Sequence, residues 1–340
     1  MNAFSKMLDK AVRDGLMSGF RVGPIGNSLQ VSHLLFADDT LVFYDADLGQ
    51  ILFLRLVLFW FEVVSGLNIN MGKSKLVLVG VVPNIIDMVD VLGYKQGSFP
   101  MQYLGLPLGA NVRDRFVWNP ILEVERRLAG WKRLYLSKGG KVTLIKSTLS
   151  NLPTYFLSLF PIPVAVANRI EQFQRNFLWS DIGDVKKTHL VKWATVCTPL
   201  HSRGLAIRSL RSFNKALFGK WLWKFGNERQ ALWRRVIGAK YGCEGGGWCS
   251  LPVIGPHGVS LWKSISCGWP SFVCHIQFKV GAGFIVRFWE DIWCGDTSLC
   301  VLYPRLFSLS RNKEASMAEL MKLPNGVLFW DLTFRRYSED

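Results

Sequence analysis

Two adjacent acids, Asp38 and Asp39, are the residues whose types and spacing point most directly to chemistry. Short apolar runs flank them within the stretch Val31–Phe43, and each run has the length of a strand. Two such arms predict a hairpin whose tight turn presents carboxylates. Carboxylate oxygens favour Mg²⁺ or Mn²⁺, and such a pair at a strand tip could hold metal for phosphoryl transfer. A solvated Asp-Asp turn is the alternative, because the pair alone is a common pattern.

The segments around this pair predict the elements that position it. Residues 1–20 carry apolar side chains at helical spacing, and residues 21–29 are rich in turn-forming Gly and Pro. A second helix is expected over residues 48–65, ended by Ser65-Gly66, and a strand over residues 76–79. The apolar part of the second helix is interrupted by charges and falls short of a membrane span, so we interpret it as a buried helix, with membrane insertion as the lesser alternative.

From about residue 114 the sequence becomes helical and basic. Residues 203–240 contain ten Lys and Arg, and Glu228 is their only acid. Exposed cations beside aromatic residues suit contact with phosphates and stacking on bases. A solvated charged face is the alternative for a single stripe. The cations that form one helical stripe here are Arg208, Arg211 and Lys215.

Beyond residue 241 the chain is rich in Gly, Trp and Cys. Alternating apolar residues over 276–280 and 284–288, joined by Gly281-Ala-Gly283, predict a hairpin. The spacings within the cysteine pairs of this region do not match a structural zinc knuckle, so we do not expect zinc. These pairs are Cys243 and Cys249, Cys267 and Cys274, and Cys294 and Cys300.

The composition of the 340 residues narrows the class of protein. Hydrophobic residues make up 49% of the chain and charged residues 19%, which excludes a disordered composition. A net charge of +16 indicates a polyanionic partner, either nucleic acid or an anionic membrane surface. Seven Cys is an odd number, which favours reduced thiols over a secreted disulfide framework. Without an apolar leader or a convincing membrane span, the nucleus or cytoplasm is the expected location.

Several motifs in one order resemble the reverse transcriptase of plant non-LTR (LINE-type) retrotransposons, and the resemblance runs to about residue 315. They are Ser32–Phe43, Phe61–Asn70, Lys73-Ser74, Tyr103–Gly109, Leu136–Lys141 and Phe173–Trp179. The resemblance implies an α+β fold. A partial polymerase palm, an antiparallel sheet with helices, would occupy residues 1–113, and a mostly helical basic thumb 114–240. A small Trp/Cys-rich region with a hairpin and a loose tail would occupy 241–340.

The resemblance also implies roles for individual residues. Asp38 would bind Mg²⁺ or Mn²⁺ directly with Asp39 in support, and Lys73 would screen the departing pyrophosphate. Tyr103, Leu104 and Gly105 would grip the primer end. An RNA or DNA template–primer would be the partner, within a retroelement ribonucleoprotein. The cations expected to track its backbone are Arg126, Arg127, Lys132, Arg133, Lys138, Lys141, Arg208, Arg211 and Lys215.

The start of the sequence departs from this family. A polymerase palm needs another catalytic Asp on an upstream strand, together with fingers, and only about thirty residues precede Val31. We therefore expect an RNA-directed DNA polymerase by descent that is inactive as this chain. A basic nucleic-acid-binding remnant and a non-functional retroelement fragment are the alternatives.

Overall fold

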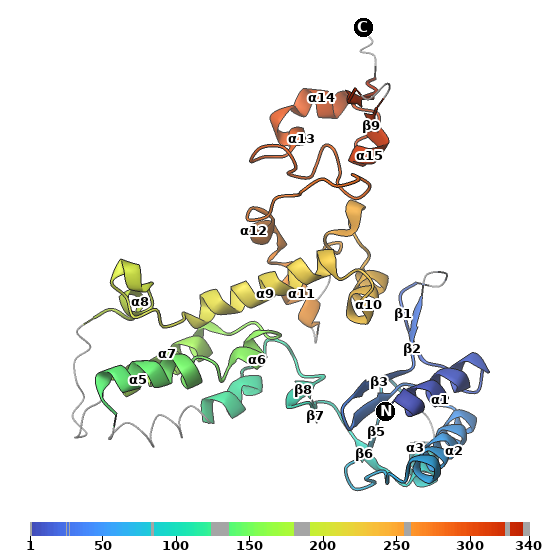
Figure 1. Ribbon diagram of the computed structural model, residues 1–340. Coiled ribbons are helices and arrows are strands. Elements are labelled where there is room, and N and C mark those ends of the chain that lie inside the picture. The colour runs from blue at the N-terminus through green and yellow to red at the C-terminus, as the bar shows by residue number, and fades with distance from the viewer. Residues whose placement is uncertain are drawn as a thin grey trace. The chain divides into compact units, whose positions relative to one another are not determined.

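The computed structural model describes residues 2–24, 26, 28–82, 85–123, 136–179, 191–254, 260–323 and 327–335 (Figure 1). Contacts divide the chain into two units. Unit 1 comprises residues 1–156, 160–207 and 257–260, and unit 2 comprises residues 157–159, 208–256 and 261–340. The expected three-part division at residues 113 and 240 stays a prediction.

In unit 1, the first helices pack against the hairpin that carries the two acids. The core here is formed by apolar residues of α1 (Asn2–Arg13) and α2 (Leu48–Ser65), among them Phe4, Leu8 and Leu54. The Asp47 carboxylate caps α2 by accepting a hydrogen bond from the Gln50 N–H at 3.1 Å. Gly66 ends the helix in the left-handed conformation, with φ of 67°. The helix predicted over residues 48–65 is therefore confirmed.

The burial of α2 differs from the expectation of a buried helix. Only Ile51, Leu54 and Val57 are buried, whereas Phe59 is 57% and Val64 75% exposed. Its other large apolar residues also lie mainly at the surface. Within the part of the chain that the structure describes, α2 is the one helix long and apolar enough to cross a membrane, judged by length and composition alone.

The strands of the described residues form five separate two-stranded sheets. Four pairs are antiparallel, and β5 with β6 is parallel. The antiparallel sheet expected of a partial polymerase palm stays a prediction. The pairs are β1 (Phe20–Val22) with β2 (Leu29–Val31), β3 (His33–Phe36) with β4 (Asp39–Val42), β5 (Lys75–Val77) with β6 (Lys95–Gly97), β7 (Met101–Tyr103) with β8 (Leu106–Leu108), and β9 (Met321–Lys322) with β10 (Phe329–Trp330).

A further core of unit 1 is helical. It packs Ile145, Leu149 and Phe177 against Trp193 and other apolar residues. The Ser137 hydroxyl caps α5 (Lys138–Leu144) by accepting a hydrogen bond from the Gly140 N–H at 3.2 Å, so the helix begins at Lys138. The remaining helical elements of this part are α3 (Ile85–Leu92), η1 (Arg115–Trp118), α5 (Lys138–Leu144), the π-helical η2 (Ile145–Leu149), α6 (Thr154–Leu157), α7 (Val164–Trp179), α8 (Trp193–Val196) and η3 (Leu200–Ser202).

Unit 2 is organised around α9 (Leu210–Asn227) and clusters of aromatic rings. Phe225 of α9 packs on Trp262 with ring centroids 5.0 Å apart, and Trp221 meets Trp233 edge-on at 5.2 Å. Such pairs add stabilisation beyond the area that they bury. The other helical elements are α10 (Leu232–Tyr241), η4 (Gly245–Gly247), α11 (Leu261–Ser266), α12 (Trp269–Val273), α13 (Leu299–Leu302), α14 (Pro304–Leu309) and α15 (Met317–Leu320) (Figure 1).

The hairpin predicted over residues 276–288 is wrong. Its second arm pairs instead with a segment farther along the chain: Met317 N–H donates to Val286 O at 2.8 Å, and Phe288 N–H to Ala315 O at 3.0 Å. The first arm is held separately, with Phe278 N–H donating to Ile292 O at 3.3 Å. Alternating apolar residues indicate an extended segment but do not identify the segment with which it pairs. Here the pairing partner is a segment distant in the sequence.

Candidate functional site

Asp38 and Asp39 lie at the turn predicted for them. Strands β3 and β4 pair antiparallel with Phe36 opposite Asp39, which leaves Ala37 and Asp38 as the two turn residues. Ala37 has a φ of 50°, in the left-handed region that favours glycine. Both carboxylates are exposed. The hairpin and its display of acids are therefore confirmed as structure, while the catalytic role stays a prediction.

A metal role for these acids has limited support in the geometry. Among the described residues, no group of three or more His, Cys, Asp and Glu side chains could hold an ion. Two exposed carboxylates from one turn leave most positions of an octahedral Mg²⁺ to water or to a ligand. The described residues therefore do not build a metal site, and the assignment of Mg²⁺ or Mn²⁺ to Asp38 and Asp39 stays a prediction.

The other residues expected to take part in catalysis are the primer-grip residues and Lys73. Tyr103, Leu104 and Gly105 belong to the β7–β8 hairpin, with Leu104 and Gly105 as its turn residues. Burial raises the pKa of Tyr103, and the nearby charge of Asp39 adds to this shift. Asp39 and Tyr103 therefore lie within electrostatic range. Lys73 is exposed, and none of the ion pairs found among the described residues joins it to Asp38 or Asp39.

The basic residues predicted before residue 142 fall into three groups. One group lies outside the described residues: Arg126, Arg127, Lys132 and Arg133. Lys138 is exposed in the first turn of α5. Lys141 is only 3% exposed within α5, so its expected phosphate contact is not supported.

Helix α9 exposes three cations along its length. Arg211, Lys215 and Lys220 are exposed, while Leu210, Asn214, Phe218, Leu222 and Phe225 are buried. At about 100° per residue, Lys215 lies about 40° from Arg211 around the helix axis, and Lys220 lies about 140° beyond Lys215, so the cations span about half of the circumference. Trp223 is 56% exposed and lies between Lys215 and Lys220 around the axis, about 60° from Lys220. We call Arg211, Lys215, Lys220 and Trp223 the α9 basic face.

Other cations of the same segment are engaged in local contacts. The Arg229 guanidinium donates to Gly246 O at 2.7 Å, and that of Arg234 to Gly247 O at 3.0 Å. Lys224 forms an ion pair with Glu228 at 3.0 Å. The predicted stripe residue Arg208 is exposed, with its guanidinium 4.8 Å from the ring centroid of Phe213.

Sequence reasoning did not single out Lys220 or Trp223. Both could have been found by projecting residues 210–227 on a helical wheel, because the buried positions recur at steps of three and four. The sequence interpretation did not distinguish the tryptophans of this segment from one another. The structure separates them, since Trp221 is half-buried and donates its indole N–H to Ser158 O at 2.8 Å, whereas Trp223 is displayed.

Comparison with known proteins gives one informative match. A protein of Arabidopsis thaliana named "Putative ribonuclease H protein" is 36% identical over 193 residues. The match covers 56% of this chain and 31% of that protein, so it spans about a third of the relative's length. No protein-family model matches the chain.

This relative overturns the assignment made from the motifs. Its name is that of a ribonuclease H protein, not of a reverse transcriptase. The recognition of this chain as a LINE-type reverse transcriptase is therefore wrong, and so is the RNA-directed DNA polymerase function derived from it. The short hairpins and helices that carried the resemblance are real, but local motifs do not establish an activity.

Proposed function

We propose that this chain binds nucleic acid, in single-stranded form, through the α9 basic face. The observation that carries the proposal is that Arg211, Lys215 and Lys220 are exposed along a well-packed helix that also exposes Trp223. Cations attract the phosphate backbone, and an exposed indole offers a ring on which a base can stack. The net charge of +16 supplies long-range attraction for the same partner.

The named relative supports a nucleic-acid partner for this chain. Hydrolysis assisted by two metal ions requires several carboxylates that converge on one point. The described residues contain no cluster of three or more metal-binding side chains. The match to the ribonuclease H protein covers 31% of its length. Binding is accordingly the activity that we propose, and RNA cleavage is not.

The test measures binding to a labelled single strand by fluorescence anisotropy at several salt concentrations. The variant replaces Arg211, Lys215 and Lys220 with Gln. Each phosphate contact to a single strand contributes about 0.7 to the slope of log affinity against log salt. Losing three contacts should therefore lower that slope by about 2, and the affinity by about 100-fold at 0.1 M salt.

A matched control separates the effect of the α9 basic face on binding from the effect of the overall charge. The control variant replaces Lys6, Lys10 and Arg13, three exposed cations on α1, with Gln, so that both variants lose three positive charges. We expect the control to retain most of the affinity and slope. Equal weakening by both variants would show that net charge alone attracts the strand. Binding that does not depend on salt would refute phosphate contact altogether.

A further inference from the structure

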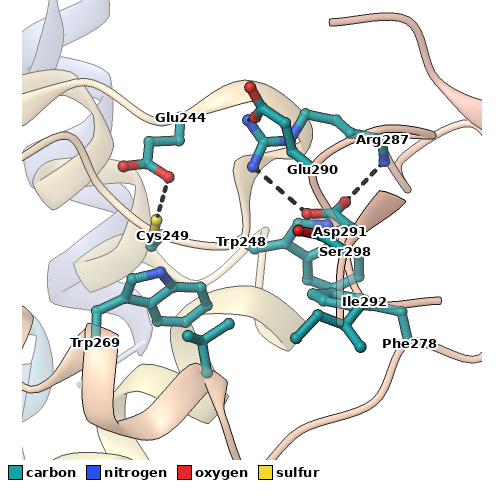
Figure 2. A pocket seen from close by; sticks show the side chains of 11 residues that line it. Glu244, Trp248, Cys249, Trp269, Phe278, Arg287, Glu290, Asp291, Ile292 and Ser298 are labelled. Carbon is teal, nitrogen blue, oxygen red and sulfur yellow. Dashed lines mark hydrogen bonds and ion pairs between the residues drawn. The ribbon is translucent and has the colours of Figure 1, made fainter. Parts of the chain in front are cut away.

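Unit 2 contains a pocket of about 250 Å³ that the proposed function does not use (Figure 2). Its walls combine aromatic rings with carboxylates. Figure 2 shows the Trp269 indole beside Cys249, and the Trp248 ring near Asp291. The lining residues are Glu244, Trp248, Cys249, Trp269, Val273, Phe278, Arg287, Glu290, Asp291, Ile292 and Ser298.

The charges of this pocket exclude a phosphate as its natural ligand. Three carboxylates face a single guanidinium, and Arg287 already forms ion pairs with Glu290 and Asp291. The Arg287 backbone N–H also donates to Asp291 at 2.7 Å. Glu244 accepts a hydrogen bond from the Cys249 thiol at 2.9 Å, through one of its two oxygens. A carboxylate can accept several hydrogen bonds, so Glu244 keeps acceptor capacity for a ligand.

The two tryptophans of the pocket differ in how tightly their rings are packed. Trp248 is held by its neighbours, with the Phe278 centroid 4.8 Å away and the Arg229 guanidinium 5.1 Å from its ring. Trp269 packs less tightly against Phe272, with centroids 5.9 Å apart. Trp269 is therefore the ring better placed to stack on a flat ligand, and Trp248 forms a fixed wall.

The pocket lies next to the C-terminal end of α9. A Cβ atom on Gly226 would lie 3.2 Å from Cε3 of Trp248, so the helix end and this wall are in close contact. The Arg229 and Arg234 guanidinium groups hold the carbonyls of Gly246 and Gly247, just before Trp248 in the chain. A strand that follows the α9 basic face toward Asn227 would therefore reach the wall of the pocket.

We propose that this pocket binds a guanine base of the strand bound along α9, stacked on Trp269 and hydrogen-bonded to Glu244. The inference rests on the proposed function. An ionised carboxylate can only accept hydrogen bonds. The N1–H and N2–H₂ groups of guanine present adjacent donors to it, whereas uracil and thymine place carbonyl oxygens on both sides of their single N–H. The carboxylates therefore select guanine against these two bases.

The test compares two strands of about twelve nucleotides, one of dT alone and one with a single central dG. A well-placed pair of hydrogen bonds discriminates between bases by about 10-fold or more, and we expect the chain to prefer the dG strand by that factor. Glu244→Gln, which preserves shape, should remove the preference and leave affinity for the dT strand unchanged. Trp269→Ala should also remove it, and thermal melting checks that both variants fold.

Two further measurements separate this proposal from the proposed function. Replacing Arg211, Lys215 and Lys220 should weaken both strands alike and leave the preference for dG unchanged. Equilibrium dialysis with guanosine and uridine tests the pocket without any phosphate. Guanosine binding that Glu244→Gln abolishes supports the pocket even if strand binding fails. Equal affinity for both strands, with no preference for guanosine over uridine, overturns the proposed guanine pocket. Salt-dependent binding of both strands in that case still supports strand binding by the α9 basic face.

Discussion

Arg234 and Arg211 belong to the same basic segment, yet the structure predicts opposite consequences of replacing them. Arg234 donates from Nη2 to Gly247 O at 3.0 Å and from Nε to Phe225 O at 3.3 Å. Its guanidinium also lies 4.3 Å from the Phe225 ring centroid. Two charged hydrogen bonds and a cation–π contact, partly exposed to solvent, are together worth about 3 kcal/mol. Arg234→Met should lower the free energy of unfolding by about that amount.

Arg211 provides the matched comparison within the same basic segment. It is exposed, and none of the described side chains forms an ion pair with it. Arg211→Met should change the free energy of unfolding by no more than about 0.5 kcal/mol, while weakening nucleic-acid binding. Urea unfolding followed by circular dichroism measures the first quantity, with equal m-values required for the comparison. Equal stability losses in the two variants would refute the division of these cations into structural and displayed groups.

Two further predictions concern thiols and stacking. Burial raises the pKa of Cys197 to about 11, and burial with the Glu244 acceptor raises that of Cys249. At pH 8 a thiol with a pKa of about 11 is about 0.1% thiolate, so iodoacetamide should label Cys197 about a hundredfold more slowly than an unperturbed thiol, and faster as pH rises. Mass spectrometry that finds Cys197 or Cys249 among the first labelled thiols would contradict this. Trp223→Ala should weaken single-strand binding by about 5- to 100-fold with an unchanged salt slope, while Trp223→Phe retains most affinity. A changed slope would contradict a stacking role.

Features that depend on local sequence were predicted well. The helix over residues 48–65 has its stop signal in the adjacent Gly66, and the structure places a left-handed cap there. The turn that displays Asp38 and Asp39 likewise depends on residues within a few positions of it. Arg211 and Lys215 were predicted as surface cations because helical spacing alone places them on one side.

Features that depend on distant partners could not be predicted in this way. The second arm of the expected hairpin found its partner near residues 315–317 rather than in the preceding arm. Arg229 and Arg234 resemble the displayed cations in sequence, but backbone carbonyls of η4 hold them. The pocket draws its lining from residues between 244 and 298, and only tertiary packing brings these together. The motif order suggested a polymerase, and the named relative did not support it.

The two tight hairpins of unit 1 share one unusual feature, a non-glycine residue in the left-handed region. Ala37 and Leu104 both have a φ of 50°. An L-residue with a side chain loses roughly 1–2 kcal/mol in this conformation, which glycine would avoid. Selection for folding stability alone would therefore favour glycine at both positions. Both hairpins therefore hold backbone strain that glycine at residue 37 or 104 would release.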